Sequence, residues 1–584
     1  MSSHNRWWLK ALTIATFATI FIPMPGRAAE RITGYFPPFK DVSISVRDLE
    51  EFARSGKLPA EYAGFATKTS RKQLQQFRQF LRQSFKVNPL YVSQFTNSPL
   101  VEQLLEGLGN SIQADGRQNG FASIRSALIG AAEDKKQGLT PINFIKQFPG
   151  REINLNIKEV FTIYDNLSEL LKLRDKTIVA LDRLAEVEAA TALDFPVNKL
   201  DLRRAGKFRW QKRKFEWLDR ARNRMVPGDL YLPKTTSTHP VPIIVISHGV
   251  AEDRTTYAYL AQHLASYGFA VAAIEHVGGD ANRFRKYFSG LAPAPKPTEF
   301  LERPRDVSFL LDEIQRRAQS DPTLRQIDVQ QVGLVGHSLG GYTVLALAGA
   351  EIDFDRVKLL CNPNQSFNLS VLLQCTAKEL KPQRYALKDP RVKAIFAINP
   401  LGSTIFGQQG MSQVKGPVFM MGSSDDLVTP VVPEQIYPFT WLQTPDKYLA
   451  ILDKGTHFST QSIPKGKGIF PVSDNLIGPD PAQARLYTRA LGVAFFQTYL
   501  ANHSEFQNYL NPAYVRLLAK PQPQPQRSNI KPSTVAVTGS NAQSLRLNLV
   551  RSAVAESIVK ALEQDNSRAT TELIPEVNWR LFWI

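Results

Sequence analysis

The sequence predicts an α/β fold in which helices cover a mostly parallel sheet, with a helical domain in front of it. The prediction depends on three stretches of different texture. Between Asp229 and about His503, short apolar runs alternate with helical segments, which is the pattern of parallel strands joined by helices. Residues 29–150 instead carry apolar side chains three and four positions apart, interrupted by Gly and Pro. Pro521–Gln526 (PQPQPQ) marks a stiff linker, so the sheet should end before it.

The composition limits the class of protein. At roughly 150 residues per domain, a length of 584 residues allows about three or four domains. A hydrophobic fraction of 43% with 10% aromatic residues is globular and excludes general disorder. Two cysteines exclude a disulfide scaffold and a multi-cysteine metal site, and no Gly-rich phosphate loop occurs in the sequence. We therefore expect no metal and no other cofactor.

The formal net charge of +18 indicates either anionic partners or a basic soluble surface. The most basic stretch, 201–224, interleaves its cations with Phe208, Trp210, Phe215 and Trp217, which favours a strand with one buried face. No nucleic-acid motif accompanies it, so we expect no nucleic-acid partner. Peripheral contact with a membrane surface stays open, and the sequence identifies no protein partner.

The first 28 residues have the layout of a secretory signal peptide. Arg6 and Lys10 precede the charge-free run Ala11–Met24, and Gly26 and Ala28 occupy the −3 and −1 positions of a cleavage site. The alternative is an uncleaved membrane anchor, but the run is shorter than the ~20 residues that a spanning helix needs. We expect cleavage and a periplasmic or extracellular mature protein.

These differences in sequence pattern divide the chain into five parts. The parts are a signal peptide at 1–28, a helical N-terminal domain at 29–150, a helical and basic connector at 151–224, an α/β domain at 225–503 with an insertion at 351–390, and a linker with a helical tail at 504–584. Helices are expected at Val42–Phe52, Leu74–Phe85 and Phe121–Ala132, and in the tail around Leu547, Val550, Val554, Ile558 and Leu562. The expected strands of the α/β domain are Ile243–Ser247, Ala270–Glu275, Val332–Val335, Ala394–Ile398, Val418–Met421 and Tyr448–Leu452.

Gly336–Gly341 (GHSLGG) is the strongest motif. It is a G-x-S-x-G turn that directly follows the expected strand Val332–Val335 and directly precedes an apolar helix. A serine in so sharp a turn needs neighbours without side chains, which the glycines supply. The alternative is a purely structural turn, but the strand and helix context favours Ser338 as a nucleophile exposed at the carboxyl end of the sheet.

A serine hydroxyl needs a base and an acid that orients the base. His457 follows the expected strand Tyr448–Leu452, where the base is found when the chain order is Ser, acid, His. Asp425 follows strand Val418–Met421 and is the predicted acid, and its neighbour Asp426 is the alternative. Asn399 occupies a second possible acid position and is disfavoured because an amide cannot stabilise an imidazolium as a carboxylate does.

Ser247-His248-Gly249-Val250 follows the first expected parallel strand. In this arrangement the loop donates one backbone N–H to an oxyanion and the residue after the nucleophile donates the other, which predicts Val250 and Leu339 as donors. His248 is expected to brace the loop.

Cys361 and Cys375 lie fourteen positions apart in the insertion 351–390. In an oxidising compartment they can form a disulfide, and the alternative is two buried thiols. The insertion lies between the nucleophile helix and the next strand, where a lid is expected.

Val245–Gly249 followed by Leu264–His276 resembles the platelet-activating factor acetylhydrolase group of the α/β-hydrolase superfamily. The resemblance covers roughly 225–500, includes the Gly336–Gly341 elbow, and implies the α/β-hydrolase fold. That group's acid follows the strand after the nucleophile helix, where this chain has Asn399. An acid at Asp425 is instead similar to dienelactone hydrolase and many bacterial esterases.

The N-terminal part, from Ala29 to Ala132, resembles an uncharacterised helical domain that precedes such hydrolases in exported bacterial proteins. This second resemblance implies architecture and export, and no activity.

The expected function is therefore that of a serine esterase or lipase, a carboxylic ester hydrolase that acts on a small-molecule or lipid ester through an acyl-enzyme on Ser338. A phospholipid acetylhydrolase-like activity is among the candidates. The same triad could instead cleave a peptide, lactone or polyester bond, and a third alternative is a catalytically idle binding protein of the cell envelope.

Overall fold

The computed structural model describes residues 28–35, 41–62, 70–85, 87–191, 200–235, 239–361, 368–462, 477–519 and 545–551. The predicted signal peptide, apart from Ala28, and most of the predicted helical tail lie outside the described residues. The chain forms two compact units, one of residues 1–97 and 105–162 and one of residues 98–104 and 163–584. We refer to them as the N-terminal unit and the C-terminal unit.

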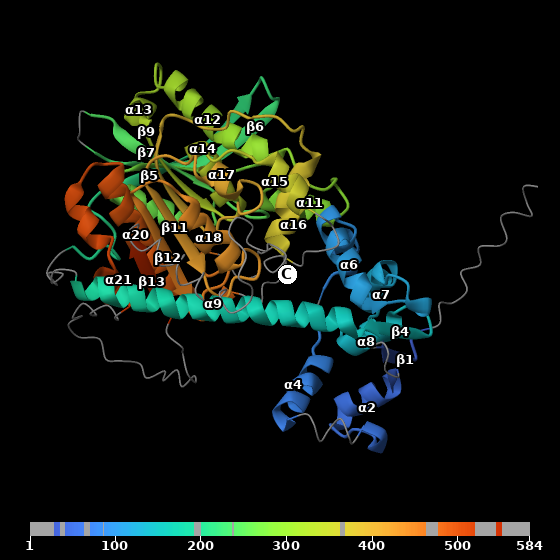
Figure 1. Cartoon of the computed structure of the whole chain (residues 1–584). Coiled ribbons are helices and arrows are strands. Elements are labelled where there is room, and N and C mark those ends of the chain that lie inside the picture. Colours follow the sequence, from blue (N-terminus) through green and yellow to red (C-terminus); the bar gives the residue numbers. More distant parts are fainter. Residues whose placement is uncertain are drawn as a thin grey trace, which may run out of the picture. The chain divides into compact units, whose positions relative to one another are not determined.

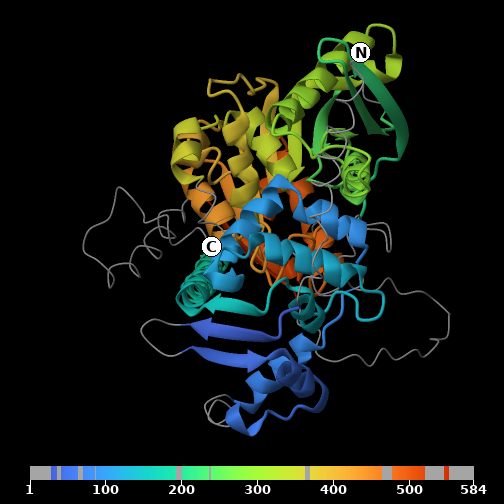
Figure 2. The same cartoon turned by 90° about the vertical axis from the view of Figure 1, so that its right-hand side faces the viewer.

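The N-terminal unit combines helices with a small sheet that the prediction of a helical domain did not include. Its strands are β1 (Arg31–Tyr35), β2 (Val42–Ser45), β3 (Ile112–Gln113) and β4 (Glu152–Asn156), in the order β2-β1-β4-β3. Figure 2 shows β1 and β2 in dark blue beside β4 in teal. Its helices include α2 (Val46–Ser55), α4 (Arg71–Leu81), α5 (Pro89–Thr96), α7 (Phe121–Glu133) and α8 (Pro141–Gln147).

The predicted helix Val42–Phe52 is divided at Ser45. Val42–Ser45 alternates apolar and polar residues and pairs antiparallel with β1, which is the behaviour of a strand. Helix α2 then begins at Val46, because the Ser45 hydroxyl accepts a hydrogen bond from the Asp48 N–H and caps the first turn. The prediction was misled by the helical spacing of the apolar residues, which made the strand β2 and the helix α2 appear as one helix.

The C-terminal unit contains a nine-stranded, mostly parallel sheet, in agreement with the predicted fold class (Figure 1). The strand order is β13-β12-β11-β10-β9-β7-β8-β6-β5, and the six central strands from β12 to β8 are parallel. All six predicted strands are confirmed. The strands are β5 (Trp210–Asp219), β6 (Arg224–Pro233), β7 (Val241–Ser247), β8 (Ala270–Ile274), β9 (Ile327–His337), β10 (Val392–Ile398), β11 (Val418–Ser423), β12 (Lys447–Asp453) and β13 (Arg546–Arg551).

Each face of this sheet is covered by its own helices. Because side chains alternate along a strand, Ile243 and Val245 of β7 belong to one apolar cluster, and Ile244 and Ile246 to another. The first cluster includes α12 (Glu299–Arg317) and α14 (Leu339–Ala348), and the second includes α10 (Ala258–Ser266) and α20 (Pro481–Tyr499). Burial on both faces explains why the central strands are continuous apolar runs.

Both edges of the sheet come from segments predicted to lie outside the α/β domain. The basic stretch forms β5, whose Phe215 and Trp217 are buried, so a strand with one buried face is confirmed there. At the other edge, the predicted helix around Leu547 is wrong. Leu545, Leu547 and Leu549 alternate into one apolar cluster, and β13 pairs antiparallel with β12. Positions 552–584 lie outside the described residues.

No helix in the described part of the chain combines the length and the apolar character that crossing a bilayer requires.

Candidate active site

Ser338 lies in a strained turn between β9 and α14. Its backbone has φ 55° and ψ −119°, a combination that a non-glycine residue adopts only when its surroundings impose it. The flanking glycines make the turn possible, because a Cβ on Gly336 would lie 2.0 Å from the Gly340 carbonyl oxygen, and one on Gly340 would lie 2.0 Å from the Ser247 carbonyl oxygen. The Ser338 N–H donates to the Ile398 carbonyl oxygen at 3.0 Å. This geometry is that of a nucleophile elbow.

His457 forms a buried pair with Asp426. Its Nδ1 lies 2.7 Å from Asp426 Oδ2. The carboxylate also accepts hydrogen bonds from the backbone N–H groups of Val428 and Thr429, at 2.8 and 2.7 Å, and from the Thr429 hydroxyl at 2.8 Å. Four donors therefore fix the carboxylate, which holds the imidazole with Nδ1 protonated and Nε2 free of this pair.

The prediction that Asp425 pairs with this histidine is wrong. The Asp425 carboxylate is half-exposed and accepts from Arg174 Nη1 at 3.1 Å, while its backbone N–H donates to the Gly455 carbonyl oxygen at 2.8 Å. Adjacent residues of a turn point in different directions, so a count of positions after the strand could not separate the two aspartates. The signal that was missed is Thr429, three residues after Asp426, where a hydroxyl and an N–H close the turn on the carboxylate.

The loop that carries His457 is tied to the elbow. The ring centroids of His337 and His457 lie 4.7 Å apart, and His337 Nε2 donates to the His457 carbonyl oxygen at 3.1 Å. Asn399, the disfavoured acid, donates to the same oxygen through Nδ2 at 3.4 Å. Because His337 directly precedes Ser338, these contacts bring the predicted nucleophile and the predicted base to the same edge of the sheet.

Val250 lies in the predicted oxyanion loop, Ser247–Val250, which begins at the end of β7. This loop packs against the elbow, because a Cβ on Gly249 would lie 3.1 Å from His337 Nδ1. The amides on either side of it are engaged, because the Gly249 N–H donates to Glu252 Oε2 at 2.9 Å and the Ala251 N–H donates to the Gly279 carbonyl oxygen at 2.9 Å. The other predicted donor, Leu339, is the first residue of α14, where a backbone N–H has no acceptor within the helix. Both predicted donors thus lie beside the turn that contains Ser338.

The buried guanidinium of Arg303 orients this loop. Arg303 of α12 is fully buried and donates to the carbonyl oxygens of His248 at 2.6 Å and Gly249 at 3.4 Å. His248 Nδ1 donates to the same Gly249 oxygen at 2.7 Å, so His248 braces the loop as expected. In a trans peptide the C=O and the following N–H point in opposite directions. Holding the Gly249 oxygen inward therefore turns the Val250 N–H away from Arg303.

Glu252 connects three parts of the site, and the sequence did not reveal it. Its Oε2 accepts from the oxyanion loop at Gly249, and its Oε1 accepts from His337 Nδ1 at 2.6 Å and from Gln461 Nε2 at 2.8 Å. Gln461 follows the predicted base, His457, by four residues. One carboxylate thus joins the predicted oxyanion loop, the elbow and the loop that carries His457.

Glu252 and His337 form an ion pair. Burial opposes the charge on His337, but the Glu252 carboxylate raises the pKa of the imidazole above its ordinary value. Burial likewise opposes ionisation of Glu252, but the His337 imidazolium lowers the pKa of the carboxyl below its ordinary value. We infer that both groups are charged near neutral pH, which gives His337 the two N–H donors that its contacts require.

Glu252→Gln is expected to destabilise the protein most between pH 4.5 and 6.5, the ordinary pKa values of the two groups. The raised pKa of His337 gives stability that is complete below 6.5 and is lost as pH rises through the folded-state value. The lowered pKa of Glu252 gives stability that is complete above 4.5 and is lost as pH falls through its folded-state value. The variant should lose about 3 kcal/mol of unfolding free energy in this window.

The measurement is urea unfolding of parent and variant from pH 4 to 9, with the exposed Glu216→Gln as the control. The difference between parent and control should be small and flat with pH. A flat difference for Glu252→Gln would contradict the ion pair.

A second Ser–His–Asp constellation lies below the oxyanion loop. Ser247 Oγ is 2.9 Å from His276 Nε2, and His276 Nδ1 is 3.0 Å from Asp306 Oδ2. Burial, followed by nearby Arg303, lowers the pKa of His276 well below its ordinary value, so the imidazole is neutral. Ser247 ends a regular strand, and no member of the three is more than 1% exposed. Ser338 is itself only 5% exposed, so its backbone geometry, rather than exposure or hydrogen bonds, distinguishes it from Ser247.

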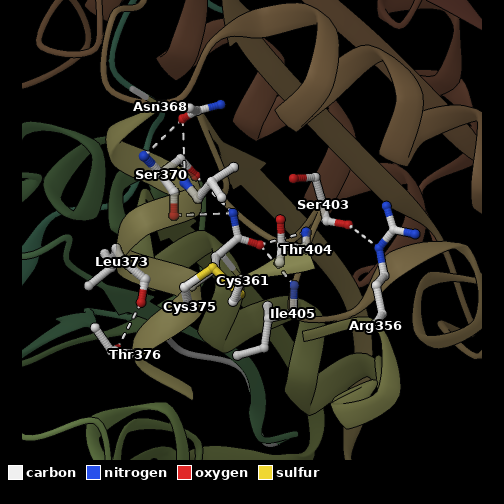
Figure 3. Close-up of a disulfide and its surroundings, with 12 residues drawn as sticks. Arg356, Cys361, Asn368, Ser370, Leu373, Cys375, Thr376, Ser403, Thr404 and Ile405 are labelled. Atoms are coloured by element: carbon white, nitrogen blue, oxygen red, sulfur yellow. Dashed lines mark hydrogen bonds between the residues drawn. A yellow bond between two sulfur atoms is a disulfide. The ribbon is translucent and has the colours of Figure 1, made fainter. Parts of the chain in front are cut away.

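The insertion carries a disulfide between Cys361 and Cys375 (Figure 3). Its described elements are α15 (Phe354–Leu360), α16 (Leu369–Cys375) and the 3-10 helix η3 (Thr376–Glu379). Gln374, beside the bridge, accepts from the backbone N–H groups of Thr404 and Ile405 at 2.8 and 3.0 Å. The insertion is therefore fixed to the loop that follows β10.

Comparison with known proteins agrees with this architecture. Residues 28–156 match a family described as an alpha/beta hydrolase of unknown function, and residues 228–297 match platelet-activating factor acetylhydrolase, isoform II. Two similar curated relatives are platelet-activating factor acetylhydrolases. The protein from Canis lupus familiaris is 30% identical over 138 residues, which are 18% of this chain and 31% of the relative. The protein from Bos taurus is 29% identical over 156 residues, 20% of this chain and 35% of the relative.

The chain thus spans about a third of the length of these relatives. The predicted resemblance to the α/β-hydrolase superfamily is confirmed, and so is the α/β fold class. The match at 28–156 corresponds to the N-terminal unit rather than to the nine-stranded sheet.

Proposed function

We propose that this chain is a serine-dependent carboxylic ester hydrolase, with Ser338 as nucleophile, His457 as base and Asp426 as the orienting acid. The observation that carries the proposal is the buried His457–Asp426 pair, tied through His337 to a strained serine turn. The similarity to platelet-activating factor acetylhydrolases supports an ester as the substrate.

The reaction follows from these positions. Ser338 Oγ attacks the ester carbonyl carbon while His457 Nε2 accepts the hydroxyl proton, and the carbonyl oxygen becomes an oxyanion held by the Val250 and Leu339 N–H groups. Asp426 stabilises the imidazolium. His457 then gives the proton to the leaving alcohol, which departs and leaves an acyl-enzyme. Water, deprotonated by the same histidine, releases the carboxylic acid and restores the serine.

The proposed substrate is a small-molecule or lipid ester with a short-to-medium acyl chain, and the proposed location is the periplasm or the extracellular space after export. No step in the proposed reaction requires a metal or another cofactor.

The test is to treat the purified protein with a fluorophosphonate, map the modified residue by mass spectrometry, and measure hydrolysis of p-nitrophenyl esters of increasing acyl length. One phosphonyl group on Ser338 is expected, with kcat/KM highest for short-to-medium chains. An unmodified Ser338 would overturn the serine mechanism. Modification of Ser338 without ester turnover would favour a peptide, lactone or polyester substrate, which a broader panel would identify.

A further inference from the structure

Residues 62–97 form a stretch of one-sided charge in the N-terminal unit. These 36 residues contain six cations, Lys68, Arg71, Lys72, Arg78, Arg82 and Lys86, and no Asp or Glu. The stretch includes α4 and α5. A surface built from it attracts anions without local compensation.

The same stretch exposes apolar side chains to an unusual extent. Of the side chains of α4 that the structure describes, Leu81 alone is buried. Phe80 is 53% exposed, and Phe77 lies three positions before it on the same side of the helix. The large apolar side chains between 71 and 95 that are at least 36% exposed are Phe77, Phe80, Phe85, Val87, Leu90 and Phe95. We refer to residues 71–85 and 87–95 as the aromatic–basic segment.

The cations are accessible and the neighbouring acids are already paired. Arg71, Lys72 and Arg82 are exposed, whereas Arg78 donates to backbone carbonyl oxygens of α2 and is structural. On α2, which lies beside α4, Glu51 pairs with Arg54 and Glu50 with Lys146. The positive charge of the segment is therefore not neutralised by the helix next to it.

We propose that the aromatic–basic segment binds an anionic lipid surface. Phenylalanine and leucine side chains have no hydrogen-bonding groups and gain most by entering the boundary of the acyl chains, while arginine and lysine reach the phosphate headgroups. Each cation near such a surface strengthens binding by about fivefold. The inference extends the proposed function by locating the ester substrate in a lipid layer, and it depends on that function only for this step.

The test is sedimentation of the purified protein with vesicles of phosphatidylcholine alone, and of phosphatidylcholine with phosphatidylglycerol, at low and high ionic strength. Binding is expected to the anionic vesicles and to weaken with salt. Arg71→Gln with Lys72→Gln should weaken it by about 25-fold. Phe80→Ser with Phe85→Ser should weaken it by about tenfold or more.

The controls make corresponding changes on the C-terminal unit. Leu218→Ser with Leu291→Ser replaces two side chains that are 46% and 78% exposed, and Lys214→Gln with Arg220→Gln removes two exposed cations. Both controls should bind vesicles as the parent does, and all variants should hydrolyse p-nitrophenyl acetate at the parental rate.

Absence of vesicle binding would overturn the proposed binding to a lipid surface, and so would equal binding by the parent and the segment variants. Capture of a protein partner by a segment that does not bind vesicles would also overturn it. Vesicle binding as expected without any ester turnover would overturn the proposed function and leave the lipid surface standing.

Discussion

Ser338→Ala is expected to lower kcat for p-nitrophenyl butyrate by about 10⁶-fold, because removal of the nucleophile from a triad leaves only binding and oxyanion stabilisation. Fluorophosphonate labelling should disappear with it. The hydroxyl is not needed for folding, since the turn is held through the Ser338 N–H and the flanking glycines. The measurement is the steady-state rate, with circular dichroism to verify the fold.

Ser247→Ala is the matched control, since it removes the serine of the buried constellation. It leaves His276 Nε2 without a partner and should cost about 1–3 kcal/mol of stability. Its kcat should stay within about tenfold of the parent, because the altered contact lies below the oxyanion loop rather than at the reacting atoms. A loss of activity in Ser247→Ala with activity retained in Ser338→Ala would exchange the two assignments.

Asp426→Asn is expected to lower kcat by about 10⁴-fold with little change in fold. The backbone N–H groups of Val428 and Thr429 both donate to Oδ1, so the carbonyl oxygen of an asparagine will keep that position. The amide nitrogen then faces His457 Nδ1 and donates to it. Nδ1 becomes an acceptor, the proton moves to Nε2, and the histidine can no longer accept the proton of Ser338.

Asp425→Asn separates this explanation from a general loss of negative charge. Asp425 is half-exposed and bonded to Arg174, so its variant should keep kcat within about threefold of the parent. Steady-state kinetics of the two variants from pH 5 to 9 provide the measurement. Equal losses in both would contradict the assignment of Asp426.

The central sheet could be predicted because its strands are buried on both faces and therefore appear as continuous apolar runs. The strands β13 and β2 could not be predicted, because their apolar residues also fit the spacing of a helix. The leucines of β13 alternate as a strand requires, but Leu547 and Val550 also fit a helical spacing, and only the free edge of β12 decides between them. In the same way, the register with β1 makes Val42–Ser45 a strand.

The candidate site was predictable where a local backbone shape demands particular residues. The glycines around Ser338 are an example, because no side chain fits there. The acid could not be predicted, because the direction of a turn decides whether Asp425 or Asp426 faces His457. The role of Glu252 could not be predicted from the sequence at all, since it arises only when three segments distant in sequence meet around one carboxylate.

The edge strand β13 has a consequence for how the protein is made. β12, which leads into the base loop, keeps one row of backbone N–H and C=O groups open until Arg546–Arg551 pairs with it. During synthesis that row stays open while the chain is made from Asp453, the end of β12, as far as Arg546. Until then the sheet ends in an unpaired edge strand, which can pair with a strand of a neighbouring nascent chain. Correct assembly therefore depends on Arg546–Arg551 pairing with β12 before a strand of another chain does.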